Sequence, residues 1–346
     1  MTRVLVTGAN GHIGANTVRS LLRHGYEVVP FVRSTSNLRG IEKLGLTCQY
    51  GDVMDYPSLV KVAQGCDAII HHATVYRMWA KNPDDIIQPA LVGTNNIFKA
   101  AKEAHVRRLI YTSSMVAVGY LPKPVGLRTE ADWNEHTKSP YYIAKTQSER
   151  EALRLSEAYG IPTIRLCPTH VSGPYDYGIT PSTKGILDFI NKTGTTYEAG
   201  TNYVHVYDVG EVHALALEHG EPGGRYVVGG DNLHLKELAA LITKLTGVKP
   251  GHLGITGPIA ELFGAIIAFP SKITGSEPPF DAKVIHDVVG RYGYFDCSLT
   301  NQTFGITPRR AEEVVRDTIR WLLFLGKIKP EVAERVSSAF PPDPDW

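Results

Sequence analysis

The spacing of Tyr141 and Lys145 suits acid–base chemistry at a carbonyl group. The two residues lie four positions apart in the segment SPYYIAK (139–145), so a helix would bring both side chains to one face. A lysine ammonium beside a phenol stabilises the phenolate and lowers the tyrosine pKa from about 10 towards neutral pH. Tyr141 can then donate a proton to a carbonyl oxygen, or remove it in the reverse direction. Lys145 is also expected to hold ribose hydroxyls, and Tyr142, one residue further round the helix, is expected to pack.

Hydroxyl groups at the end of one predicted strand can assist the tyrosine. The apolar run RLIY (108–111) is typical of a buried strand, and Thr112, Ser113 and Ser114 follow it directly. A hydroxyl held there can hydrogen-bond a substrate oxygen and polarise it. On the residues alone, either serine can take this role.

A glycine-rich turn near the N-terminus predicts a dinucleotide-binding site. The run RVLV is followed by Thr7-Gly8-Ala9-Asn10-Gly11-His12-Ile13-Gly14 and then by a helical pattern. The glycines permit a tight turn, close approach of the backbone to a pyrophosphate, and close packing of the helix on the strand. The helix N-terminus adds unpaired N–H groups and a positive dipole end.

The end of the second predicted strand favours NADP(H) over NAD(H). The residues there are Arg33-Ser34-Thr35-Ser36-Asn37, with no carboxylate to bind the ribose 2′-hydroxyl of NAD. A guanidinium with neighbouring hydroxyls, such as Arg33 with Ser34, suits a 2′-phosphate instead. NAD(H) remains the alternative cofactor.

The elements that position these residues alternate as in a parallel sheet. Apolar runs predict strands at 3–8, 27–33, 46–52, 68–74, 108–114 and 163–169, with helices at 13–24, 95–104 and 145–159. After Pro168 the rhythm changes, with strands at 202–206 and 225–230 and helices at 208–219, 235–246 and 309–325.

We therefore expect an α/β protein with a doubly wound, parallel-sheet Rossmann fold and a smaller, interleaved substrate lobe. The dinucleotide domain is predicted at 1–170, with a strand and helix returning at about 203–230. The substrate lobe is predicted at 171–202 and 231–346.

The composition indicates no nucleic acid partner and no membrane span, and leaves a contact of residues 253–270 with a membrane surface as an alternative. The 346 residues carry a formal net charge of +1, which creates no field for a polyanion. The most apolar stretch, residues 253–270, is interrupted by Pro258 and Glu261. It predicts an amphipathic helix over the active site rather than a membrane-spanning helix, which needs about 20 apolar residues.

Four scattered cysteines and the lack of a signal peptide favour a reduced, cytoplasmic protein. The adjacent histidines at 71–72 lack a third ligand nearby, so no metal is predicted.

Together these motifs resemble the extended short-chain dehydrogenase/reductase superfamily, which has the NAD-dependent epimerase/dehydratase fold, over almost the whole chain. Within it the chain is similar to the dihydroflavonol 4-reductase and cinnamoyl-CoA reductase group and its bacterial relatives. The segments that carry the resemblance are VTGANGHIG (6–14), FVRSTSN (31–37), GDVMD (51–55), HHAT (71–74), QPALVGTNN (88–96), TSS (112–114), TEADW (129–133), YYIAK (141–145) and VHVYDVGEVHALALE (204–218). Nucleotide-sugar epimerases usually have N-V-x-G-T where this chain has Pro89-Ala90.

The resemblance implies roles for further residues. It favours Ser114 over Ser113 as the catalytic hydroxyl beside Tyr141 and Lys145, with Ser113 near the cofactor. The other residues implied to contact the cofactor are Asp52 and Val53 at the adenine, His72, Ala73 and Thr74 at the pyrophosphate and ribose, Thr112 at the strand end, and Pro168, Thr169 and Val171 at the nicotinamide.

The reaction implied is reversible hydride transfer between NADPH and an aldehyde or ketone. Two alternatives are a nucleotide-sugar epimerase or dehydratase with tightly bound NAD, and a non-catalytic NADPH-sensing protein, which the retained Tyr–Lys pair disfavours. The N-W-Y-C-Y-G-K signature of cinnamoyl-CoA reductases is missing, so a coenzyme A ester is not implied. The protein is expected to be a monomer or a homodimer.

An apolar or aromatic small-molecule substrate is expected from the number of Tyr and Trp side chains among the candidate pocket residues. The candidate pocket residues are Tyr76, Trp79, Val116, Trp133, His170, Tyr175 and Tyr177. Core packing is the alternative role for about half of them.

Overall fold

The large sheet of this protein consists of parallel strands. The computed structural model describes residues 2–73, 79–252, 282–341, 343 and 346. Seven strands pair in the order β10-β6-β5-β4-β1-β2-β3, and every pairing is parallel. Their bounds are Arg3–Thr7 (β1), Glu27–Val32 (β2), Gln49–Tyr50 (β3), Ala68–His71 (β4), Arg108–Thr112 (β5), Thr163–Pro168 (β6) and Arg225–Val228 (β10). The order of β1 to β6 is that of a doubly wound sheet, which confirms the predicted fold class.

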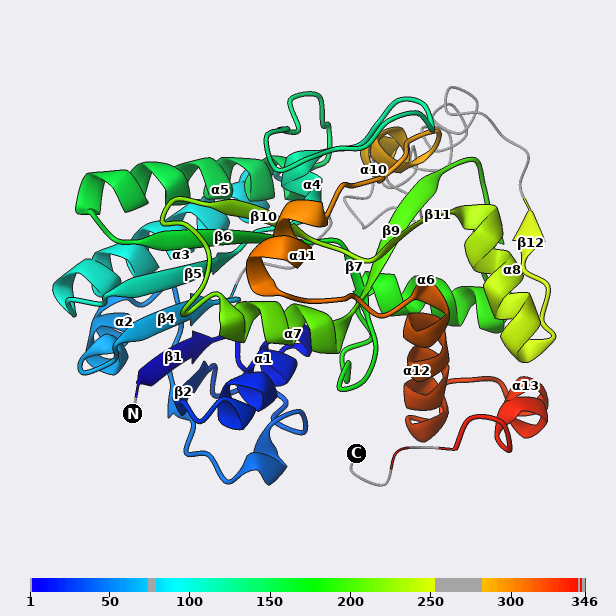
Figure 1. The fold of residues 1–346 in the computed structure, drawn as a ribbon, viewed down its shortest axis with the longest axis horizontal. Coiled ribbons are helices and arrows are strands. Elements are labelled where there is room, and N and C mark those ends of the chain that lie inside the picture. Colours follow the sequence, from blue (N-terminus) through cyan, green and yellow to red (C-terminus); the bar gives the residue numbers. More distant parts are fainter. Residues whose placement is uncertain (1, 74–78, 253–281, 342, 344–345) are drawn as a thin grey trace.

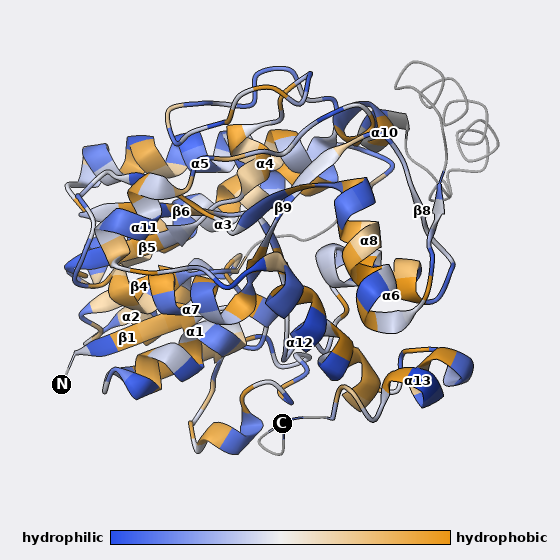
Figure 2. Ribbon diagram, turned by 45° about the vertical axis from the view of Figure 1, so that its right-hand side comes forward, coloured by the Kyte–Doolittle hydropathy of each residue, from blue (hydrophilic) through white to orange (hydrophobic). Residues whose placement is uncertain are grey.

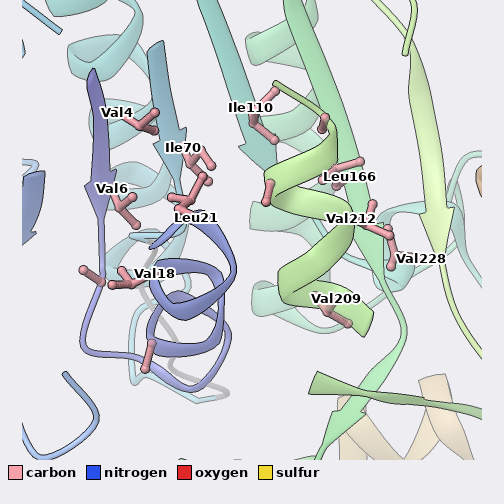
Figure 3. Packing of buried hydrophobic residues seen from close by; sticks show 14 of the residues in the cluster. Val4, Val6, Val18, Leu21, Ile70, Ile110, Leu166, Val209, Val212 and Val228 are labelled. Atoms are coloured by element: carbon pink, nitrogen blue, oxygen red, sulfur yellow. The ribbon is translucent and has the colours of Figure 1, made fainter. Parts of the chain in front are cut away.

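Helices cover both faces of this sheet (Figure 1). One face carries α1 (His12–Arg23), α7 (Val206–Leu215) and α11 (Ser298–Phe304), and the other carries α2 (Tyr56–Ala63), α3 (Asp84–Glu103) and α5 (Pro140–Tyr159). In Figure 3, Val18 and Leu21 of α1 and Val209 and Val212 of α7 belong to one buried cluster with Ile110 of β5. Figure 2 shows both hydrophobic and hydrophilic residues on these helices, as expected where only one face is buried.

Helix α3 is longer than its sequence pattern predicts. It begins at Asp84 rather than at residue 95 and contains Pro89 in its interior. A proline there removes one backbone hydrogen bond and normally ends or kinks a helix. Ile86 and Ala90 on either side of it are buried in a cluster with Ala144 of α5, and this packing favours the helix despite the proline.

The second lobe has a small sheet and a core of its own. Strands β7 (His170–Ser172), β9 (Gly200–His205) and β11 (Asp231–His234) pair in the order β11-β9-β7. Around them lie α6 (Pro181–Ile190), α8 (Leu235–Thr246), α12 (Ala311–Phe324) and α13 (Pro330–Val336), which share a buried cluster with Tyr203 of β9 (Figure 1). Residues 203–230 were predicted to return to the dinucleotide domain. Of the elements in this segment, β10 pairs in the large sheet and α7 packs on it, whereas β9 belongs to the small sheet. The remaining elements are α4 (Met115–Val118), α10 (Ala282–Val288), a 3-10 turn at Glu42–Leu44, and the pair β8 (Thr195–Thr196) and β12 (Gly251–His252).

Over residues 2–73, 79–252 and 282–341, no helix is long and apolar enough to cross a membrane. The helix predicted over 253–270 lies outside the described residues.

We expect Gly210→Ala to destabilise the contact between α1 and α7. A Cβ at Gly210 would lie 2.8 Å from the carbonyl oxygen of Asn16, so the helices would have to separate, at a cost of about 1–3 kcal/mol in unfolding free energy. Gly185→Ala in α6 is the control, because its Cβ would make an ordinary contact of 3.6 Å with Tyr203 and should gain about 0.5–1 kcal/mol. Urea unfolding of both variants tests this, and equal shifts would contradict it.

Candidate active site

A cavity of about 700 Å³ opens at the carboxyl ends of β1, β2, β4, β5 and β6. The chain leaves β1 for α1 on one face of the sheet and leaves β4 for α3 on the other, and ligands of open α/β sheets bind at such a switch point. The predicted site residues that line the cavity are Gly8, Asn10, Gly11, His12, Ile13, Gly14, Arg33, Asp52, Val53, His72, Ala73, Thr112, Ser113, Ser114, Tyr141, Lys145, Pro168, Thr169 and Val171.

The glycine-rich turn has the geometry that a dinucleotide requires. Gly8 has φ +68°, and a Cβ there would lie 3.0 Å from the backbone nitrogen of Ala73. A Cβ at Gly14 would lie 2.2 Å from the carbonyl oxygen of Gly8, so neither position tolerates a side chain. Helix α1 starts after Gly11, without a side-chain cap and without an acidic residue in its first turn. Its N-terminus is therefore suited to an anion such as a pyrophosphate.

Thr7 supports this turn from beneath and does not line the cavity. Its hydroxyl lies 2.8 Å from Nδ1 of His71 and accepts from the backbone N–H of Ala73 at 3.3 Å. The residue therefore ties the ends of β1 and β4 together. Thr74 lies outside the described residues.

A positive charge without an ion-pair partner among the described residues lies where the cavity meets the end of β2. Arg33 is exposed, lines the cavity and makes no ion pair with any described carboxylate. Ser36 also lines the cavity close to Arg33 in the sequence, whereas Ser34 does not line it. Asp52 lines the same cavity just after β3, the strand that pairs with β2. Its Oδ1 accepts a hydrogen bond from the backbone N–H of Met54 at 2.9 Å.

A chain of hydrogen bonds fixes the protonation state of His72. Nδ1 of His213 lies 2.7 Å from the carbonyl oxygen of Val209, which can only accept, so Nε2 carries the lone pair. The Thr112 hydroxyl, 2.9 Å away, donates to that lone pair and accepts from Nδ1 of His72, also at 2.9 Å. Burial lowers the pKa of His213 to about 4 and holds that of His72 well below its ordinary value. Both rings are therefore neutral. No cluster of three metal-binding side chains exists in the described part of the chain.

The two serines at the end of β5 have different partners. Ser113 donates its hydroxyl hydrogen to Oε2 of Glu149 at 2.6 Å. Ser114 caps α4, where its Oγ accepts from the backbone N–H of Val116 at 3.4 Å. A capping hydroxyl still has its hydrogen to donate, so Ser114 can hydrogen-bond a substrate oxygen in the cavity and Ser113 is committed elsewhere.

Tyr141 and Lys145 lie in the first two turns of α5 and line the same cavity. Both side chains are buried, and Tyr141 packs in a cluster with Met115 and Cys167. The ammonium of Lys145 makes no hydrogen bond or ion pair with the residues that the structure describes, so its donors are available to a ligand. Burial lowers the pKa of Lys145 to about 8, against the opposing negative charge of Glu149.

The lowered pKa of Lys145 predicts an alkaline limit for carbonyl reduction. The ammonium loses its proton as pH rises through about 8. The charge that stabilises the phenolate left by proton donation from Tyr141 is then lost, so Tyr141 becomes a weaker acid. We therefore expect kcat/KM for reduction to fall above about pH 8, since this parameter reports ionisations of the free enzyme. A kcat/KM profile that stays flat from pH 7 to about 10 would contradict this role of Lys145.

Two predicted pocket tyrosines lie in an aromatic cluster away from the cavity. The rings of Tyr175 and Tyr177 pack on Trp321 of α12, with centroids 5.5 and 4.9 Å away. Each also faces a guanidinium, from Arg19 and Arg39 respectively. Neither tyrosine lines the cavity, because α12 provides an aromatic partner that the local sequence does not reveal.

Of the other predicted pocket residues, those that the structure describes do not line the cavity either. The ring of Trp133 contacts the guanidinium groups of Arg225 and Arg150, at 3.9 and 4.9 Å from its centroid. His170 Nδ1 lies 2.7 Å from Oγ1 of Thr201, and burial lowers its pKa to about 4. Val116 and Trp79 are also absent from the cavity lining, and Tyr76 lies outside the described residues.

Several lining residues were not singled out from the sequence. They are Phe31, Val32, Gly51, Met54, Pro89, Ala90, Gly93, Thr94, Tyr111, Thr180 and Ser182. The α3 members belong to the QPALVGTNN segment, which had served only to mark a resemblance. Thr180 and Ser182 follow the irregular stretch after β7, where no periodic pattern identified them.

Comparison with known proteins establishes the family. The model of the NAD dependent epimerase/dehydratase family matches residues 4–229, and the chain belongs to this family. Cinnamoyl-CoA reductase 1 of Petunia hybrida is 33% identical over 257 residues, which cover 70% of this chain and 76% of the relative. The bifunctional dihydroflavonol 4-reductase/flavanone 4-reductase of Malus domestica is 30% identical over 261 residues, 69% of this chain and 75% of the relative. These relatives confirm the predicted resemblance.

Solved structures agree on the fold. The crystal structure of gox2253 has a TM-score of 0.83 and 31% identity, and the match covers 95% of this chain and 100% of that one. The UDP-glucose 4-epimerase of Thermus thermophilus in complex with NAD has a TM-score of 0.72 over 92% of this chain and 98% of its own, but its 21% identity supports the fold alone. The protein is thus an extended short-chain dehydrogenase/reductase, an oxidoreductase of a family that depends on nicotinamide dinucleotides.

Proposed function

We propose that this protein is an NADP-dependent reductase that converts an aldehyde or ketone to an alcohol, reversibly. The observation that carries the proposal is that Tyr141, Lys145 and Ser114 line one cavity with the glycine-rich turn. Two relatives named as reductases support reduction as the reaction. Their names refer to cinnamoyl and flavonoid compounds, which supports an aromatic or apolar carbonyl as the substrate.

In this mechanism the protein supplies proton transfer and charge stabilisation, and the dinucleotide, when bound, supplies the hydride. Tyr141 donates a proton to the substrate oxygen as negative charge develops on it. The Ser114 hydroxyl donates a hydrogen bond to the same oxygen, where it stabilises that charge. Lys145 holds ribose hydroxyls through its ammonium donors and stabilises the phenolate that Tyr141 becomes when it has donated its proton.

Arg33 supports NADP as the cofactor. It is a cation without an ion-pair partner in the described structure, at the cavity end where β2 stops, and Ser36 adds a hydroxyl beside it. The 2′-phosphate of NADP would accept charge-assisted hydrogen bonds from Arg33 and a hydrogen bond from the hydroxyl of Ser36. In this proposal the dinucleotide binds to a domain formed by residues 1–170, to which a strand and a helix at about 203–230 return. Residues 171–202 and 231–346 form the lobe that binds the substrate. The four free cysteines favour the cytoplasm as its compartment.

The test is oxidation of NADPH, followed at about 340 nm, by the purified protein with a panel of aromatic and aliphatic aldehydes and ketones. NADH is run in parallel. Turnover that prefers NADPH is expected. No turnover with any carbonyl, together with NAD that co-purifies with the protein, would overturn the proposal in favour of a nucleotide-sugar epimerase or dehydratase.

A further inference from the structure

A fully buried carboxylate lies on the helix that carries Tyr141 and Lys145. Glu149 follows Lys145 by one helical turn in α5, so the three side chains share one face. It has no exposed surface. Its Oε1 accepts from Nε of Arg225 at 2.6 Å, and its Oε2 accepts from Nη2 of the same guanidinium at 3.0 Å. Arg165 of β6 approaches Oε1 at 3.4 Å.

The same carboxylate holds the end of β5. Ser113 donates its hydroxyl hydrogen to Oε2 of Glu149 at 2.6 Å, and its backbone N–H donates to the carbonyl oxygen of Leu166 at 2.7 Å. The next residue is Ser114. Glu149 therefore connects the helix of the Tyr–Lys pair with the backbone that positions the third catalytic hydroxyl.

Arg225 extends this network to the loop before α5. Its Nη1 donates to the carbonyl oxygens of Glu130, at 2.9 Å, and Asp132. The ring of Trp133 covers the guanidinium at 3.9 Å. The TEADW segment, which marks the resemblance to the reductase group, is thus the segment that docks on the buried Glu149–Arg225 pair.

Stability alone does not account for these buried charges. Desolvation of a buried ion pair offsets much of its attraction, and apolar residues of similar volume often give equal or greater stability. A buried pair whose hydrogen bonds are satisfied does, however, fix the positions of the groups that it joins.

We propose that Glu149 is a positioning residue that, through Ser113, fixes the hydroxyl of Ser114 relative to Tyr141 and Lys145. This inference rests on the proposed reductase function. Glu149 does not reach the cavity, so it acts only through its neighbours. Its negative charge has a second effect, because it opposes the burial that lowers the pKa of Lys145.

The first test is Ser113→Ala, which removes the link to β5 and leaves the Glu149–Arg225 pair intact. We expect kcat to fall about 10- to 100-fold, because small displacements of catalytic groups have effects of that size. NADPH affinity, measured by fluorescence titration, should change much less than kcat, because the Ser113 hydroxyl donates its hydrogen to Glu149. Ser156→Ala is the matched control, since Ser156 is a buried serine of α5 whose hydroxyl donates to the carbonyl of Ile161 at 2.8 Å, away from the cavity. Ser113→Thr retains the donor and should restore much of kcat.

The second test is Glu149→Gln, which keeps an acceptor for Ser113 but removes the charge. The pKa of Lys145 should then fall, so the alkaline limit of kcat/KM should move to lower pH, an effect that loss of packing alone would not produce.

Wild-type kcat in Ser113→Ala would overturn the proposal. So would an inactive Ser113→Ala beside a fully active Ser114→Ala, because Ser113 would then be the catalytic hydroxyl of a working reductase. A wild-type protein that reduces no carbonyl would instead overturn the proposed function, and this inference with it.

Discussion

Replacing Tyr141 with phenylalanine is expected to lower kcat for carbonyl reduction by about 10³-fold, within the range for loss of a general acid. Phenylalanine keeps the ring that packs against Met115 and Cys167 and loses only the hydroxyl. NADPH should therefore still bind, because the glycine-rich turn and Lys145 are unchanged. Steady-state kinetics and an NADPH fluorescence titration on the same preparation measure both quantities.

The adjacent tyrosine provides the control. The hydroxyl of Tyr142 lies 3.4 Å from that of Tyr120, and Tyr142 does not line the cavity. Tyr142→Phe should therefore keep most of kcat. Full activity of Tyr141→Phe would remove this residue from the mechanism, and equal losses in the two variants would point to packing rather than proton transfer.

Reversing the charge at Arg33 is expected to change the cofactor preference by about 100-fold. A charge-assisted hydrogen bond contributes about 1.5–3 kcal/mol, and each 1.4 kcal/mol corresponds to about tenfold in affinity. Arg33→Glu loses this contact and repels a 2′-phosphate, so kcat/KM should fall for NADPH and change little for NADH. Arg33 is exposed and has no ion pair to lose within the described structure, so the fold should be unaffected.

A nearby arginine serves as the control for charge. Arg39 is also exposed, but its guanidinium lies 4.5 Å from the ring of Tyr177 and it does not line the cavity. Arg39→Glu makes the same change in net charge and should affect both cofactors slightly and equally. An equal loss of NADPH and NADH activity in Arg33→Glu would refute the 2′-phosphate site.

The features that the sequence predicted are those set by neighbouring residues. The turn from Gly8 to Gly14 depends on a positive φ at Gly8 and on the close contact of Gly14 with the carbonyl oxygen of Gly8, so one short segment is enough to predict it. The spacing of Tyr141 and Lys145 is likewise fixed by the period of a single helix. The alternation of apolar runs determined the parallel sheet, because each strand and its helix form one local unit.

What the tertiary structure decided depends on partners that are distant in sequence. Ser113 and Ser114 differ in their hydrogen-bond partners, because the hydroxyl of Ser113 donates to Glu149, two elements further along the chain. The aromatic residues at 133, 175 and 177 suited a pocket by type, yet Arg225 and Trp321 bind them elsewhere. Helix α3 continues through Pro89 because the packing of Ile86 and Ala90 outweighs the lost backbone bond. Local spacing fixes backbone geometry, whereas the burial of a side chain depends on which surface the folded chain brings to it.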